Sequence, residues 1–236
     1  MRFANSSFQA PPLTKINKIL IVGIVFFFLI HSILKAVSGV YLSQFLSLSG
    51  GFFFSGHLYQ LITYPLMATG LFEVLFDCLL LWFIGGELEL LWGSNRYLKY
   101  IAVSTLFGGL IFLAISSFLS AWTYLSGPGG MCLAILVAYA ILFPDRSLLL
   151  VFFPVKAKWF CLIMAGILLY QGVFLPGAAG VWGQLGAMAS GFIYLIFLAR
   201  NALKLPGFLT RKKKKSNPGL KIVRGDNDDQ GPKMWH

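Results

Sequence analysis

Long apolar stretches that carry few or no charges dominate this sequence. Six of them can be distinguished, at residues 19–37, 70–92, 97–119, 131–144, 159–174 and 181–199. An α-helix rises about 1.5 Å per residue, so a stretch of about 20 residues is long enough to cross the hydrocarbon layer of a bilayer. The chain is 58% hydrophobic and 11% charged, whereas the surface of a soluble domain needs about 25% charge. The sequence therefore predicts an all-α integral membrane protein with six transmembrane helices.

The polar segments divide the chain into three parts. Residues 1–18 form a polar N-terminal segment, and residues 19–200 form the predicted membrane domain. Within that domain, the uncharged 38–69 connection is broken by glycines and a proline, so we expect a structured outer loop at the membrane interface. Residues 148–155 are too short to cross and contain Pro154, which suggests an interfacial hairpin. Residues 201–236 are basic and polar, and we expect a disordered tail.

The basic residues predict how the chain is oriented. The net charge of +11 is concentrated in the tail and loops rather than on a folded face, which argues against a nucleic-acid partner. With six spans, 18 of the 19 Lys and Arg residues lie on the same side as the termini and only Lys35 lies on the other. The positive-inside rule then places both termini in the cytoplasm, and we expect a multi-pass protein of a bacterial inner membrane. Anionic lipids are possible partners of four tail lysines, Lys212, Lys213, Lys214 and Lys215.

A turn rich in glycine and proline opens the fourth apolar stretch. It has the sequence L-S-G-P-G-G-M at residues 125–131. Proline suits the first turn of a helix, and clustered glycines let another backbone or a substrate come close. Helix starts of this kind can hold a nucleophile, because their N–H groups stabilise developing negative charge. Here, however, residues 127–130 contain no nucleophile, and the nearest hydroxyl belongs to Ser126, just before them.

Acidic residues inside the second stretch also need an explanation. Glu73 and Asp77 are four residues apart and share one helix face. Carboxylates inside a span are costly and usually functional, although these two could instead lie near the outer headgroups, protonated or hydrogen-bonded across the bundle. Further along, Glu87, Glu89 and Arg96 are expected to form an anchoring network. The cysteines suggest small core residues rather than a disulfide framework or a metal site.

Three segments resemble the rhomboid family of intramembrane serine proteases. They are L-I-T-Y-P-L at 61–66, G-G-E-L-E-L-L-W-G-S-N-R-Y-L at 85–98 and A-Y-A-I-L-F-P-D-R-S-L-L-L-V-F-F-P-V-K-A-K-W-F at 138–160. The resemblance covers roughly residues 16–200 and implies a six-helix rhomboid-like bundle. It also implies a serine nucleophile where the fourth span opens, a histidine base in the sixth span, and a histidine and asparagine in the second span that hold the oxyanion.

Every functional position that the resemblance implies is occupied by a different residue. When the fourth span is aligned on residues 138–139, the nucleophile position falls on Gly129, the base position on Gln184, and the oxyanion pair on Glu73 and Asp77. Glycine has no nucleophile, a glutamine amide takes up no proton near neutral pH, and two carboxylates would repel an oxyanion. The histidines all lie outside spans two to six, at His31, His57 and His236.

The sequence therefore predicts a rhomboid-like pseudoprotease without a cofactor or metal, whose partners are the transmembrane segments of client proteins. We expect a polar client cleft lined by Gly127, Gly129, Gly130, Glu73, Asp77 and Gln184. Two alternatives remain open. One is a small transporter or ion-coupled carrier that uses Glu73 and Asp77, and the other is a divergent active protease with Ser126 as nucleophile. Glu73 and Gln184 facing each other under an opening would favour the client cleft, whereas a through-going polar path would favour transport.

Overall fold

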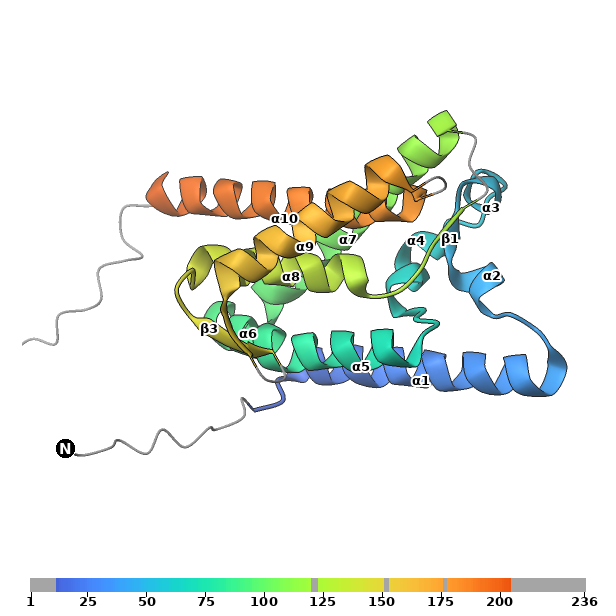
Figure 1. Ribbon diagram of the computed structural model, residues 1–236, viewed down its shortest axis with the longest axis horizontal. Helices are drawn as coiled ribbons and strands as arrows, with labels where there is room; N and C mark the ends of the chain where they lie inside the picture. The colour runs from blue at the N-terminus through green and yellow to red at the C-terminus, as the bar shows by residue number, and fades with distance from the viewer. Residues whose placement is uncertain (1–11, 120–122, 151–152, 176–177, 205–236) are drawn as a thin grey trace, which may run out of the picture. The chain divides into compact units, whose positions relative to one another are not determined.

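The computed structural model describes residues 12–119, 123–150, 153–175 and 178–204, and most of these residues are helical. The helices are α1 (Lys15–Ser38), α2 (Ser43–Leu46), α3 (Gly50–Phe54), α4 (Gln60–Thr63), α5 (Leu71–Leu80), α6 (Gly86–Trp92), α7 (Ser94–Leu119), α8 (Gly129–Leu142), α9 (Ala157–Phe174) and α10 (Ala179–Lys204) (Figure 1). A 3-10 turn, η1 (Tyr64–Leu66), precedes α5, and a π-helical turn, η2 (Leu81–Gly85), joins α5 to α6. Residues up to Ala199 form one compact unit, and a second unit begins at Arg200.

Four of the described helices are long and apolar enough to cross a membrane, namely α1, α7, α9 and α10. The bent pair formed by Gln60–Leu66 and Leu71–Trp92 makes a fifth span if it is counted as one. The prediction of an all-α membrane protein is therefore confirmed. The count of six spans is not, because the fourth apolar stretch forms the 14-residue helix α8, about 21 Å long.

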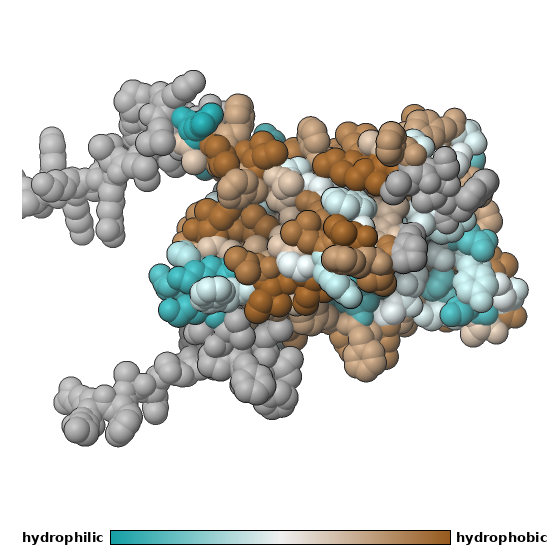
Figure 2. Space-filling view, turned by 45° about the horizontal axis from the view of Figure 1, so that its top comes forward, coloured by the Kyte–Doolittle hydropathy of each residue, from teal (hydrophilic) through white to brown (hydrophobic). Residues whose placement is uncertain are grey.

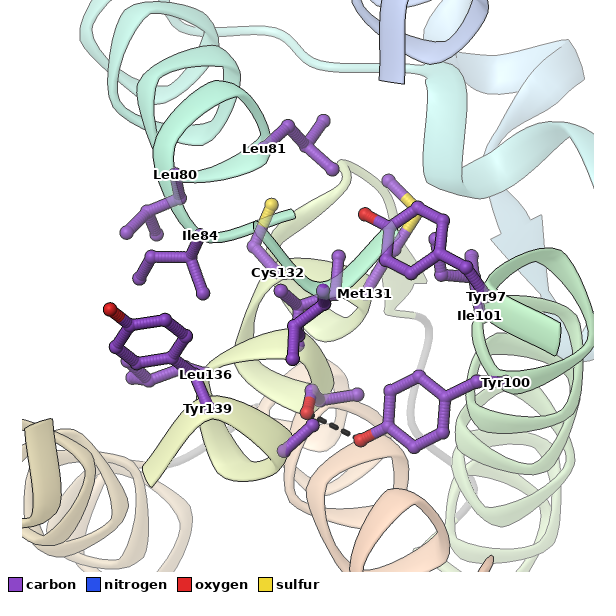
Figure 3. Close-up of a cluster of buried hydrophobic side chains, with 14 of the residues drawn as sticks. Leu80, Leu81, Ile84, Tyr97, Tyr100, Ile101, Met131, Cys132, Leu136 and Tyr139 are labelled. Atoms are coloured by element: carbon purple, nitrogen blue, oxygen red, sulfur yellow. Dashed lines mark hydrogen bonds between the residues drawn. The ribbon is translucent and has the colours of Figure 1, made fainter. Parts of the chain in front are cut away.

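Helix α8 is short and largely surrounded by other elements of the protein. It packs against α5, η2, α7 and α9, and nine of its 14 residues are buried. Its core neighbours come from the second and third apolar stretches (Figure 3). The Tyr100 hydroxyl of α7 donates a hydrogen bond of 2.5 Å to the Ala134 carbonyl oxygen of α8. Burial of this apolar cluster fixes α8 in the bundle, so the helix start that holds the candidate site has a defined position.

Helices α7 and α10 approach each other closely at glycines of both helices, and Gly183, Ala187 and Gly191 of α10 have the four-residue spacing of small side chains that permits such an approach. A Cβ atom added to Gly108 would lie 2.8 Å from the Ala187 Cβ and 2.8 Å from the Gly183 carbonyl oxygen. A Cβ atom on Gly191 would lie 2.5 Å from the Tyr100 hydroxyl oxygen. The small residues of α10, which recur every four positions, therefore form its contact with α7.

The 38–69 connection folds into the short elements α2, α3, α4 and η1 together with strand β1 (Leu48–Ser49). Strand β1 pairs antiparallel with β2 (Tyr124–Leu125), which lies just before the glycine-rich turn. The hairpin predicted within residues 148–155 is present as the antiparallel pair β3 (Ser147–Leu150) and β4 (Phe153–Lys156). The β1–β2 pairing joins the connection to the segment that enters α8.

Glu89 connects the start of α1 to α6. Its side chain is buried, and its carboxylate accepts hydrogen bonds from the backbone N–H groups of Ile16 (3.1 Å) and Asn17 (3.2 Å). The Ser94 hydroxyl donates to the same carboxylate at 2.6 Å. The N–H groups of a first helical turn have no acceptor within their own helix, so Glu89 satisfies donors that would otherwise be unpaired.

Apolar side chains remain exposed on the outer faces of the long helices. In Figure 2, hydrophobic residues cover much of the middle of the face in view. Examples that are more than half exposed are Phe26 on α1, Leu162 and Phe174 on α9, and Phe197 on α10. Such faces suit contact with lipid chains.

Candidate functional site

Gly127, in the turn that leads into α8, occupies a position that only glycine fits. Its φ of +93° lies in the region that side chains disfavour. A Cβ atom at this position would lie 2.1 Å from Oε1 of Glu73. The Gly127 N–H donates a hydrogen bond of 3.0 Å to the Tyr64 carbonyl oxygen of η1. The turn is thereby held between the loop before α5 and the Glu73 side chain.

Glu73 lies in the first turn of α5 and caps its own helix. Its Oε2 accepts hydrogen bonds from the backbone N–H groups of Gly70 (3.2 Å) and Thr69 (3.3 Å), while Oε1 faces Gly127. A carboxylate at this end of a helix is favoured by the helix dipole. Glu73 is therefore hydrogen-bonded, but to the start of its own helix and not to another helix across the bundle, and its carboxyl group lies beside the turn.

Gln184 of α10 approaches the same turn from another helix. A Cβ atom on Gly129 would lie 3.3 Å from the Gln184 Nε2 atom, and one on Gly130 would lie 3.8 Å from the Gln184 Cα atom. The same Gly130 Cβ would be 3.4 Å from the Ala187 Cβ. The positions that the rhomboid resemblance assigns to the nucleophile and the base thus face each other. The Gln184 amide lies next to the place that a side chain on residue 129 would occupy.

Asp77 is separated from the other predicted cleft residues. It lies one helical turn further along α5, and only 6% of it is exposed. The buried Cys132 thiol of α8 donates to its backbone carbonyl oxygen at 3.7 Å. The structure therefore gathers Glu73, Gln184 and the glycines around the start of α8, whereas Asp77 packs against the body of that helix.

No histidine of the described part is hydrogen-bonded to a serine. His31 lies in α1 with 4% of its surface exposed, and its Nδ1 atom has no hydrogen-bond partner. His57 is half-buried, and its Nδ1 lies 3.1 Å from the Phe52 carbonyl oxygen. Ser126, just before the turn, is half-buried. His236 lies outside the described residues, which also contain no group of three or more His, Cys, Asp or Glu side chains able to hold a metal.

Sequence reasoning missed the part that Tyr64 plays in positioning the turn. Tyr64 is buried, its hydroxyl donates to the Thr105 carbonyl oxygen of α7 at 2.6 Å, and its own carbonyl accepts from Gly127. Tyr64 therefore connects the η1 turn, α7 and the entry to α8. Its place in the L-I-T-Y-P-L segment was the available signal, but the segment does not reveal its two distant partners.

Comparison with known proteins agrees with this architecture. A relative from Arabidopsis thaliana, Rhomboid-like protein 19, is 30% identical over 151 residues, which cover 60% of this chain and 49% of the relative. The chain spans about half the length of this relative, and the match confirms the rhomboid resemblance. The model of one family, "Eukaryotic integral membrane protein (DUF1751)", matches residues 18–230. Since that family is eukaryotic, the expected bacterial inner membrane is not supported, and the chain belongs to the eukaryotic integral membrane protein family DUF1751.

Proposed function

We propose that this protein is a rhomboid-like pseudoprotease, which binds transmembrane segments of client proteins without cleaving them. The observation that carries the proposal is the approach of Gln184 to Gly129, where a Cβ atom would lie 3.3 Å from the amide nitrogen. A glycine supplies no nucleophile, and an amide does not act as a base near neutral pH. The two positions that hold the nucleophile and the base in a rhomboid protease therefore still lie side by side, but Gly129 and Gln184 at these positions cannot carry out acyl transfer.

Electrostatics at the turn support the loss of chemistry. A protease stabilises the oxyanion of its tetrahedral intermediate with hydrogen-bond donors. Glu73 instead places a carboxylate against Gly127, two residues before the degenerate nucleophile position. A negative charge there opposes the development of an oxyanion.

The same residues suit recognition of a peptide backbone. Gly129 is partly exposed and presents no side chain, so another chain can come close. The half-buried Gln184 amide offers both donors and an acceptor, which can satisfy the backbone groups of a partly unwound transmembrane segment. The client cleft is therefore centred on the start of α8, with Asp77 outside it.

The carrier alternative has less support. Glu73 already uses one carboxylate oxygen to cap α5, and the other lies against Gly127. Asp77 is buried beside Cys132, with only 6% of its surface exposed.

A test of catalysis uses the purified full chain in detergent, a fluorophosphonate probe and a model transmembrane substrate. We expect neither labelling nor cleavage. Specific labelling that disappears in Ser126→Ala would overturn the proposal and support a divergent protease.

A test of binding uses a photo-crosslinking amino acid at position 184, with position 193 as the matched control. Both positions lie on α10, and Ile193 is 64% exposed on the outer face. Position 184 should capture transmembrane segments of native membrane proteins, and position 193 should capture fewer. Equal capture at both positions would show that the start of α8 has no special role in client binding.

A further inference from the structure

Helices α8, α9 and α10 enclose a groove that the candidate site does not use. Its volume is about 570 Å³. Small side chains on the three helices, Ala140, Ala165 and Ala189, leave the space open. Every lining side chain except Lys158 is uncharged and largely apolar. The groove therefore suits a hydrocarbon chain, with one positive charge on its wall.

Lys158 belongs to a charged cluster at the start of α9. Its Nζ atom lies 3.1 Å from the Asp145 Oδ1 atom, and the Nζ atom of Lys156 lies 3.7 Å from the same oxygen. Arg146 pairs with Glu87 at 2.5 Å. Three cations thus share two carboxylates, which leaves this end of the groove with a net positive charge. The exposed Asp145 Oδ1 atom pairs with both lysines, and an exposed ion pair contributes little free energy. Lys158 can therefore exchange this partner for another anion.

We propose that this groove binds an acyl chain of an anionic phospholipid, with the lipid phosphate on Lys158. The apolar walls match the chain, and the ammonium matches the phosphate. The groove also borders lipid-facing surface, since Leu162 lines it and is 63% exposed. This site is separate from the tail lysines, which lie outside the described residues, and it does not depend on the proposed client binding.

A transmembrane helix is a poorer fit to this groove. The lining residues of α9 run from Lys158 to Ala165, a rise of about 10 Å. A membrane-spanning helix is about 30 Å long, so this groove would contact only about a third of its length. The dimensions favour a flexible chain over a helix.

The test measures lipid binding to the purified full chain in detergent by native mass spectrometry. The probes are dioleoyl phosphatidic acid and the zwitterionic dioleoyl phosphatidylcholine. Phosphatidic acid should bind about fivefold more tightly, since one lysine near a phosphate contributes about 1 kcal/mol. Lys158→Gln should remove this preference, whereas Lys99→Gln, which deletes the same charge from α7, should keep it.

A second pair of variants tests the chain-binding part of the groove. Ala165→Trp should reduce the binding of both lipids. Gly166→Trp serves as its control, because a Cβ atom on the neighbouring Gly166 meets no atom within 4 Å. If Ala165→Trp is not monodisperse, Ala189→Phe fills the groove from α10 instead.

Several outcomes would overturn the proposal. One is equal affinity for the two lipids in the unmodified protein, and another is unchanged lipid binding in the Ala165→Trp and Ala189→Phe variants. A third is competition by glycerol 3-phosphate as strong as that by phosphatidic acid, which would indicate a phosphate site that binds no acyl chain. A synthetic transmembrane peptide that binds the groove while phosphatidic acid does not would assign it to a different ligand.

Discussion

Gly127 and Gly129 stand two residues apart in the same turn, but their surroundings differ. Gly127 combines a φ of +93° with an oxygen of Glu73 at the place of a Cβ atom. Gly129 has no positive φ, and its nearest neighbour is the flexible end of the Gln184 side chain at 3.3 Å. The fold therefore constrains Gly127 through its φ, whereas at Gly129 only a movable side-chain end limits the space for a small side chain.

We expect Gly127→Ala to lower the free energy of unfolding by about 1–2 kcal/mol, because alanine is strained at this φ and the Glu73 carboxyl group would have to move away from the turn. Gly129→Ala should change it by less than about 0.5 kcal/mol, since the amide can move. Thermal unfolding of both variants in the same detergent measures the difference. Equal destabilisation would show that the turn is less constrained than this geometry indicates.

Glu73 should limit any restored catalysis. In the double variant Gly129→Ser with Gln184→His, we expect slow fluorophosphonate labelling at most. Adding Glu73→Gln replaces a repelling carboxylate with an amide that can donate, and it should raise the labelling rate about tenfold or more. The labelling time course decides the question. An unchanged rate in the triple variant would mean that Glu73 does not affect this chemistry.

At the scale of elements, backbone contact between α7 and α10 holds the bundle together where the candidate site is built. Residues 183–191 of α10 approach both α7 and the first turn of α8. An added methyl group at this contact meets backbone, which cannot move without separating the helices. Packing of this kind is sensitive to volume.

Gly108→Ala should therefore destabilise the protein by about 1–3 kcal/mol, because its Cβ would lie 2.8 Å from a backbone oxygen of α10. Gly166→Ala is the matched control in a helix, since it places the same methyl group in open space. That control should be neutral or stabilising by up to about 1 kcal/mol through helix propensity. Unfolding midpoints in detergent measure both, and a neutral Gly108→Ala would contradict the close contact.

The two glutamates of α6 give a second comparison between elements. Glu89 is buried and caps α1, whereas Glu87 makes a partly exposed ion pair with Arg146. Glu89→Ala should cost about 1–3 kcal/mol, because it leaves buried donors unpaired. Glu87→Ala should cost less than about 1 kcal/mol. Hydrogen exchange at the Ile16 and Asn17 amides should speed up only in Glu89→Ala, and protection in both variants would argue against the cap.

At the scale of the whole molecule, the number of membrane crossings depends on α8. Six crossings place the two termini on one side, and five place them on opposite sides. Helix α8 is buried within the bundle, and if it is counted as a sixth crossing, 18 of the 19 Lys and Arg residues lie on the same side of the membrane as the termini. We therefore expect both termini in the cytoplasm. Epitope tags at each end, probed after selective permeabilisation of the plasma membrane, should become accessible together. Tags that differ in accessibility would mean that α8 does not count as a crossing.

Much of this organisation follows from the sequence, because apolar length and small-residue spacing are local signals. The six apolar stretches coincide with helices, and Gly183, Ala187 and Gly191 predict a close helix contact that the structure contains. The pairing of Gly129 with Gln184 was accessible only through the family resemblance, since no local pattern relates positions 55 residues apart. The length of α8 and the separation of Asp77 from Glu73 depend on which helices surround them, so the sequence alone did not predict them.

The Glu89 cap has a consequence for how the protein is made. The first turn of α1 finds its hydrogen-bond acceptor 73 residues later in the chain. When α1 leaves the ribosome, those amides have no partner in the protein until α6 has been synthesised and has reached them. Docking of the first helix is thus completed only after the second apolar stretch is in place, so the N-terminal end of α1 stays uncapped until α6 has been synthesised.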